Sequence, residues 1–159
     1  MDVASRHHLR SDEVKRLRET VADALGVDIQ ADSYELVELE DSPFDLVLVD
    51  GEPLACYLED RPFLTVRGAN AYPPTRRTVT VDAGAVSFVG DGADVMRPGI
   101  VEADDDIAAG DLVVVTEETH GKALAIGEAL VEGPEMPGDE GRVVESRHHV
   151  GDDLFELTL

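Results

Sequence analysis

The segment Val81–Ile100 contains the residue types in this chain that best suit the binding of a ligand. It reads VDAGAVSFVGDGADVMRPGI and holds four glycines and a proline within twenty positions. Glycine lets the backbone adopt φ > 0 or approach another molecule closely. Apolar residues between the glycines, Phe88 and Met96 among them, can anchor the segment to a core. A segment that is both glycine-rich and anchored is typical of a loop that presents main chain to a ligand.

The rest of the chain offers little chemistry for catalysis or metal binding. The serines lack a G-x-S-x-G context, and there is no Walker loop or dinucleotide fingerprint. The adjacent pairs His7–His8 and His148–His149 diverge on a strand, and Asp104–Asp106 lacks the spacing of a calcium loop. The single cysteine, Cys56, forms no disulfide or cysteine zinc site within the chain. We therefore expect no enzyme activity, no cofactor and no metal.

The charge of the chain is strongly acidic. Its 159 residues include 35 Asp and Glu against 13 Lys and Arg, which gives a formal net charge of −22. Such an excess opposes compaction by self-repulsion and is tolerated where salt screens it. The composition is therefore typical of a halophilic acidic protein. The alternative is that the acidic surface binds a basic partner.

Basic residues are clustered despite this excess. The stretch Arg61–Val81 has no acidic residue and contains four arginines, Arg61, Arg67, Arg76 and Arg77. Further basic residues, Arg6, Arg10, Lys15, Arg16 and Arg18, lie near the N-terminus. Two interpretations stay open, since these side chains can contact phosphates or can pair with the abundant carboxylates.

The first half of the chain predicts an α+β domain over residues 1–77. Apolar spacing indicates a helix from Ser11, its expected N-cap, to Leu25, with Gly26 after its end. Asp50-Gly51 is a strong hairpin signal. The expected strands are Tyr34–Leu39, Asp45–Val49, Pro53–Leu58 and Phe63–Arg67. Tyr72-Pro73-Pro74 stiffens the connection to the next domain.

The second half, residues 78–159, predicts a mostly-β domain. A short helix is expected over Ala83–Val89, and many short strands with regular turn signals suggest a small, partly open barrel. The C-terminal segment Leu154–Leu159 is expected to be extended. The longest apolar runs are the four residues of Leu46–Val49 and of Leu112–Val115, so we expect a soluble, cytoplasmic protein.

The segment Val81–Ile100 resembles the signature of PUA domains, a small RNA-binding fold. Three later segments resemble further PUA features in the same order: DIAAGDLVVV over Asp106–Val115, ALAIGEA over Ala123–Ala129, and HVGDDLFEL over His149–Leu157. The resemblance implies an α+β N-terminal domain (1–77) followed by a mostly-β PUA pseudobarrel (78–159). It also implies RNA-facing positions at Gly92, Ala93, Met96, Arg97, Pro98 and Gly99. The clustering of basic residues adds Arg67, Arg76 and Arg77 as further expected RNA contacts. In this interpretation the amides of Gly92 and Ala93 and the Arg97 guanidinium donate to the RNA.

The helix, the hairpin and the Tyr-Pro of the first half look like the malignant-T-cell-amplified-sequence type of protein, which is similar to the N-terminal part of ligatin. This resemblance implies an archaeal, haloarchaeal-like counterpart. It further implies a non-enzymatic, ribosome-associated factor in translation initiation or recycling that contacts tRNA or small-subunit rRNA. Its partners would be the small ribosomal subunit and an initiation-factor-one-like protein. The alternatives are an accessory RNA-binding subunit of a pseudouridine or archaeosine enzyme, and an adaptor whose acidic face binds a basic protein.

Overall fold

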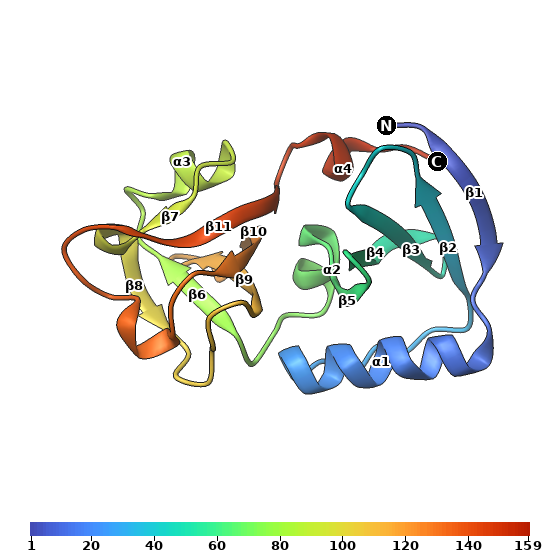
Figure 1. Ribbon diagram of the computed structural model, residues 1–159, viewed down its shortest axis with the longest axis horizontal. Helices are drawn as coiled ribbons and strands as arrows, with labels where there is room; N and C mark the ends of the chain where they lie inside the picture. The colour runs from blue at the N-terminus through green and yellow to red at the C-terminus, as the bar shows by residue number, and fades with distance from the viewer. The chain divides into compact units, whose positions relative to one another are not determined.

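A computed structural model describes residues 1–159, which divide into two compact units, Met1–Pro73 and Pro74–Leu159 (Figure 1). We call them unit 1 and unit 2 and describe each by itself.

Unit 1 is a five-stranded antiparallel sheet with two helices. The strands follow each other in the order β1-β2-β3-β4-β5. The elements are β1 (Val3–His8), α1 (Ser11–Leu25), β2 (Tyr34–Leu39), β3 (Phe44–Val49), β4 (Glu52–Leu58), β5 (Arg61–Leu64) and α2 (Val66–Ala71). Such a meander needs only short turns, and Asp50 and Gly51 make one of them with φ of 49° and 85°.

Helix α1 buries one stripe of apolar residues, Leu17, Val21, Ala24 and Leu25, and ends at Gly26, whose φ is 68°. Its bounds confirm the predicted helix, but the N-cap is Arg10 and Ser11 is already the first helical residue. The Arg10 amide donates to the Glu13 carboxylate at 2.9 Å, which satisfies one of the free groups at this helix end. The sequence pattern gave no sign of β1, since all six of its residues are exposed and lack an apolar alternation.

The expected strand Phe63–Arg67 ends early because a helix begins inside it. Thr65 caps α2 by accepting a hydrogen bond from the Gly68 amide at 3.0 Å, and its hydroxyl donates to the Pro53 carbonyl at 2.8 Å. Gly68 is required here, since a Cβ at this position would lie 1.7 Å from the Leu54 carbonyl oxygen. Arg67, which was predicted to end a strand, is instead an exposed residue of α2.

Unit 2 is a six-stranded sheet in the order β7-β11-β10-β9-β6-β8, with β6 and β9 parallel and the other pairs antiparallel. The elements are β6 (Thr78–Val81), α3 (Val86–Gly90), β7 (Val95–Met96), the 3₁₀ turn η1 (Arg97–Gly99), β8 (Ile100–Ala103), β9 (Leu112–Glu117), β10 (Ala123–Ala129), the 3₁₀ turn η2 (Gly133–Glu135), β11 (Arg142–His149) and α4 (Asp153–Glu156).

The sheet of unit 2 is a nearly closed pseudobarrel. Its two edge strands, β7 and β8, are consecutive in the chain and are joined by the three residues of η1. So short a connection brings the two edges together, and the sheet must curl around its core. Val79, Val113, Val115, Ile107 and Met136 are among the side chains that fill this core. The segment Val81–Ile100 thus lies where the barrel closes.

The C-terminal segment is not extended as predicted, because Asp152 caps a short helix. Its carboxylate accepts a hydrogen bond from the Phe155 amide at 2.8 Å, which starts α4 at Asp153. None of the helices is long and apolar enough to cross a membrane.

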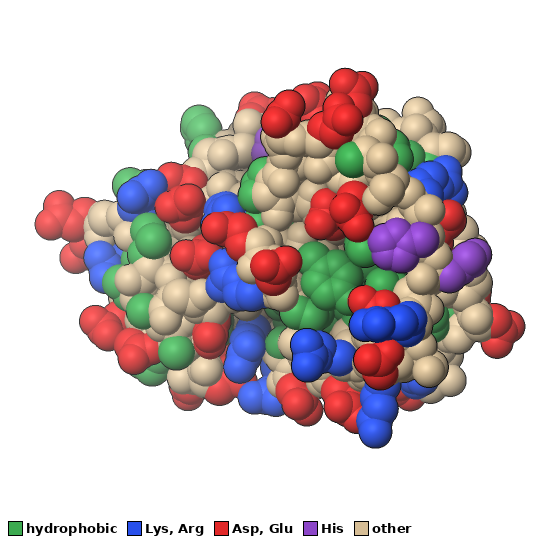
Figure 2. All heavy atoms as spheres, turned by 45° about the vertical axis from the view of Figure 1, so that its right-hand side comes forward, with side chains coloured by type: hydrophobic (Ala, Val, Ile, Leu, Met, Phe, Trp, Pro, Cys, Tyr) green, Lys and Arg blue, Asp and Glu red, His purple; other side chains and the backbone are tan.

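Arginine side chains of both units lie in ion pairs with the abundant carboxylates. Examples are Arg6–Glu35 at 2.9 Å, Arg18–Asp28 at 3.2 Å and Arg142–Asp94 at 2.9 Å. Exposed pairs of this kind add little to stability, because water and salt screen them. Figure 2 shows basic side chains interspersed among the acidic ones on the visible face, and Arg6 and Arg18 are paired with carboxylates in this structure.

Candidate functional site

A shallow, largely apolar pocket of about 440 Å³ lies at the closure of the barrel. Helix α3, strand β7 and η1 form it, with Ala85, Phe88, Ala93, Met96, Pro98 and Gly99 among its lining residues. Phe88 is 67% exposed and Met96 49% exposed. The expected anchoring of these two side chains in the core is therefore wrong, whereas Val89 and Val95 are buried. An exposed aromatic ring beside a thioether offers a surface on which a planar, unstacked base can lie.

The backbone amides of Gly92 and Ala93, which were predicted to donate to RNA, form hydrogen bonds within the protein. The Gly92 amide donates to the Val89 carbonyl and the Ala93 amide donates to the Phe88 carbonyl, both at 3.0 Å. These bonds satisfy free carbonyl groups at the end of α3. The expectation that the two amides donate to RNA is thus not met in this conformation. Ala93 itself is exposed and lines the pocket.

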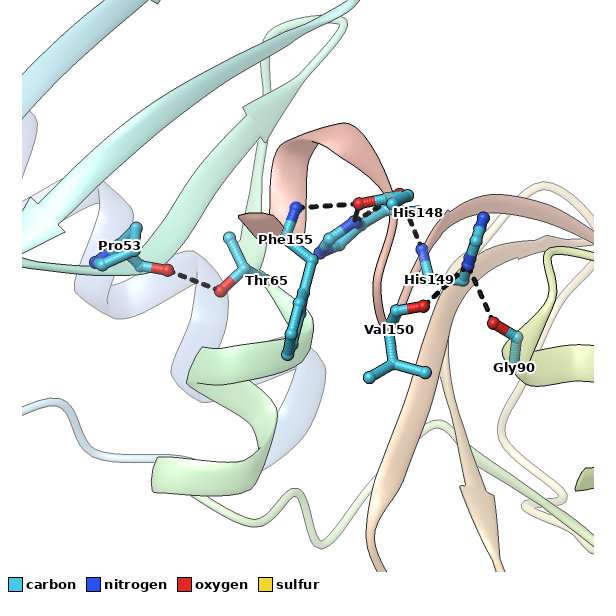
Figure 3. Close-up of polar contacts among 8 residues, drawn as sticks. Pro53, Thr65, Gly90, His148, His149, Val150 and Phe155 are labelled. Atoms are coloured by element: carbon cyan, nitrogen blue, oxygen red, sulfur yellow. Dashed lines mark hydrogen bonds and ion pairs between the residues drawn. The ribbon is translucent and has the colours of Figure 1, made fainter. Parts of the chain in front are cut away.

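Gly92 is required for packing against His149. Its φ is +97°, and a Cβ there would lie 2.7 Å from Nε2 of His149. The His149 ring is fixed because Nδ1 lies 3.0 Å from the Gly90 carbonyl oxygen and 2.9 Å from that of Val150 (Figure 3). With two carbonyl acceptors, Nδ1 carries the hydrogen and donates. His149, at the end of β11, thus positions the turn at Gly92 that lies next to the pocket.

Arg97 holds a loop instead of presenting a fork for phosphate. Its Nε donates to the Glu135 carbonyl and its Nη1 to the Glu140 carbonyl, both at 3.0 Å. Gly138 and Gly141 pack closely on this side chain, since a Cβ at either would lie within 3 Å of it. With Nε and Nη1 both engaged, neither pair of guanidinium nitrogens is free as a whole to bind a phosphate in the two-pronged manner that was predicted. Arg97 is therefore a positioning residue for the segment between η2 and β11.

The other predicted arginines lie away from the pocket or in the other unit. Arg76 donates two hydrogen bonds to Asp106 Oδ2, at 3.1 and 2.9 Å, and Arg77 lies 3.7 Å from Asp111 Oδ2. Both precede β6, whereas Asp82 of the pocket follows its other end. Arg67 belongs to unit 1.

Aspartates at the pocket carry structural hydrogen bonds. Asp94 accepts from Arg142 Nη1 at 2.9 Å and from the Ser146 amide at 2.8 Å. Partial burial by itself raises the pKa of Asp94, but these hydrogen bonds outweigh it and hold the pKa below its usual range. Asp82 accepts from the Ala85 amide at 3.0 Å. Carboxylates at the rim disfavour phosphate, so the pocket suits a base better than a backbone.

A buried histidine–aspartate pair, His148 and Asp152, stabilises the C-terminal segment that joins β11 to α4. His148 is 1% exposed, and its Nδ1 lies 2.9 Å from Asp152 Oδ2, which also accepts from the His149 amide at 2.9 Å. Burial by itself raises the pKa of Asp152, but the hydrogen bonds from His148, His149 and Phe155 prevail and lower it. Sequence reasoning missed this pair, because only the fold turns His148 inward.

Replacing Asp152 by asparagine is expected to destabilise the protein by about 1–2 kcal/mol at pH 7. The NH2 group that replaces Oδ2 cannot accept from His148 or from the His149 amide, whereas the remaining amide oxygen can still cap α4. Because folding lowers the pKa of Asp152, its carboxylate stabilises the fold above about pH 4, the unfolded value, and this contribution is lost as pH falls through the folded pKa. Urea unfolding between pH 7 and pH 3.5 should show the difference shrinking toward the acidic end. Asp153→Asn, its exposed neighbour, is the control, and a deficit that stays constant with pH would contradict this role.

Three comparisons with known proteins bear on this site. The family described as "PUA domain" matches residues 77–150. An uncharacterised protein of Methanocaldococcus jannaschii is 34% identical over 99% of both chains, and translation machinery-associated protein 20 of Saccharomyces cerevisiae is 34% identical over 79% of this chain and 72% of its own. The structure of a conserved PUA domain protein from Thermoplasma acidophilum superposes with a TM-score of 0.82 at 31% identity, covering 95% of this chain and 97% of that one.

The chain belongs to the PUA-domain family that includes translation machinery-associated protein 20.

Human malignant T-cell-amplified sequence 2 is also similar, at 29% identity over 71% of this chain and 65% of its own. The resemblance noted in the sequence is thereby confirmed. The matched residues 77–150 lie in unit 2, which is the PUA domain, and they include α3, β7 and η1 with the pocket.

Proposed function

We propose that this PUA protein is a non-enzymatic RNA-binding factor of the translation machinery, which holds an unstacked base of tRNA or small-subunit rRNA in the pocket at the closure of unit 2. The observation that carries the proposal is that the PUA signature forms an open pocket with an exposed aromatic ring, Phe88. The relationship to translation machinery-associated protein 20 supports the assignment to translation.

Stacking and shape, more than charge, would supply the affinity of this site. An aromatic platform contributes about 1–3 kcal/mol for each stacked base. The pocket residues include no Lys or Arg, and Asp82 and Asp94 lie among them. Stacking contacts depend weakly on salt, whereas each phosphate contact adds nearly one unit to the slope of log affinity against log salt concentration. A protein with a net charge of −22 that works at high salt would therefore retain such a site.

The predicted residues take different parts in this proposal. Ala93, Met96, Pro98 and Gly99 contact the base, while Gly92 and Arg97 shape the loop around it. Arg67, Arg76 and Arg77 are proposed as peripheral phosphate contacts, for which Arg76 and Arg77 would exchange Asp106 and Asp111 for phosphate.

Co-sedimentation of the full-length protein with purified small ribosomal subunits in molar KCl tests this function. We expect the protein to pellet with the subunits and Phe88→Ala to stay in the supernatant. Pelleting that Phe88→Ala leaves unchanged would contradict the proposed pocket. Failure to bind the subunits, together with recovery in complex with an RNA-modifying enzyme, would favour the accessory-subunit alternative.

A further inference from the structure

Unit 1 has a hollow of about 800 Å³ that the proposed function does not use. Its floor is apolar and includes Leu36, Tyr57 and Pro62. Residues of the first half of α1, Glu13 and Arg16 among them, form one wall. Figure 2 brings this unit forward and shows hydrophobic side chains in a depression with charged side chains around it.

The floor follows from the strand register. Asp45 pairs with Tyr57 and Tyr57 pairs with Pro62, so these three side chains lie side by side on one face of β3, β4 and β5. Leu36 pairs with Val47, two residues from Asp45, which places Leu36 and Glu38 of β2 on the same face. Val47 is fully buried, whereas Leu36, Tyr57 and Pro62 are only partly buried. The apolar surface thus continues from the core into the hollow.

The rim of the hollow is acidic. Five carboxylates line it, Asp12, Glu13, Glu38, Asp45 and Asp60, against two arginines, Arg10 and Arg16. Arg10 already lies 3.6 Å from Asp12 and 3.3 Å from Glu13. Glu38 and Asp60 form no ion pair or hydrogen bond through their carboxylates. The hollow therefore keeps unbalanced negative charge beside exposed apolar surface.

We propose that this hollow is the docking site for a short basic segment of a partner protein, with an aromatic or aliphatic residue on Tyr57 and Lys or Arg side chains paired with Glu38, Asp45 and Asp60. Charge complementarity selects this occupant. Five carboxylates repel an RNA backbone, and a second copy of a chain with a net charge of −22 is repelled as well. The apolar floor supplies the affinity that surface charge pairs lack.

Fluorescence polarisation of the full-length protein with a labelled synthetic peptide tests the proposal. The probe alternates lysine and leucine around one tryptophan, and in its control peptide glutamate replaces lysine. We expect Tyr57→Ala to weaken binding of the lysine peptide about tenfold or more, as truncation of a central aromatic anchor does. Tyr57→Phe keeps the ring and should retain binding, which separates loss of contact from loss of fold.

A matched pair of variants separates this site from general attraction to an acidic protein. Glu38→Gln with Asp60→Asn should weaken binding about fivefold or more by removing two rim charges. Glu102→Gln with Asp105→Asn removes two exposed charges from unit 2 and should leave binding unchanged. Equal losses in both pairs would overturn the proposal. It would also be overturned by a single-stranded RNA probe that binds in a Tyr57-dependent way. Phe88→Ala should not affect the peptide, so this test is independent of the RNA-binding proposal.

Discussion

Replacing Phe88 by alanine is expected to weaken RNA binding by about 5- to 150-fold, which corresponds to the loss of one base stacked on an aromatic ring at about 1–3 kcal/mol. The ring is 67% exposed, so its removal leaves the core intact and the free energy of unfolding almost unchanged. Fluorescence anisotropy with bulk tRNA and with a labelled single-stranded RNA of mixed sequence measures the affinity.

Val101→Ala is the matched control for Phe88→Ala. Val101 is an exposed apolar residue on β8, outside the pocket, with 50% of its surface accessible. It should bind RNA as the unmodified protein does. The salt dependence of binding should also keep its slope in Phe88→Ala, since no phosphate contact is removed. An affinity that does not differ between Phe88→Ala and Val101→Ala would refute the stacking surface.

Replacing Arg97 by alanine is expected to lower the free energy of unfolding by about 2–4 kcal/mol, because two charged hydrogen bonds to carbonyl groups are lost. These bonds join η1 to Glu135, the last residue of η2, and to Glu140, in the loop before β11. Amide hydrogen exchange of residues 132–141 should increase most, and urea unfolding gives the overall loss.

Arg76→Ala serves as the comparison for Arg97→Ala, because Arg76 pairs with exposed Asp106 and should cost at most about 1 kcal/mol. RNA affinity distinguishes a positioning role from direct contact. Arg97→Ala should bind more weakly only to the extent that the loop is displaced, and its salt slope should stay unchanged. A slope that falls by about one unit, with stability unaffected, would show that Arg97 contacts a phosphate instead.

Local signals in the sequence predicted much of the fold. The period of Leu17, Val21 and Ala24 and the following Gly26 were enough to predict α1, and Asp50-Gly51 predicted the turn between β3 and β4. These features depend on residues close together in the chain. The short helices α2 and α4 were missed, because each starts with a single capping side chain, Thr65 or Asp152, inside a segment with no helical period.

The sequence pointed to the segment that forms the pocket but not to the contacts of its side chains. The signature glycines and Pro98 marked a segment that lies at the closure of the barrel, and its role in RNA binding stays a prediction. The partners of its side chains lie far along the chain: Arg97 bonds to carbonyls 38 and 43 residues away, and His149 to Gly90, 59 residues away. Spacing in the sequence carries no information on such pairs. Nor does it reveal that Phe88 faces solvent while its neighbour Val89 is 2% exposed.

Ultraviolet crosslinking of a bound single-stranded RNA, with the crosslinked residues mapped by mass spectrometry, tests most directly whether a base enters the pocket. The proposed geometry predicts crosslinks at Phe88 and Met96, and their loss in Phe88→Ala. Crosslinks confined to the neighbourhood of Arg67, Arg76 and Arg77, with the pocket residues unmodified, would contradict it.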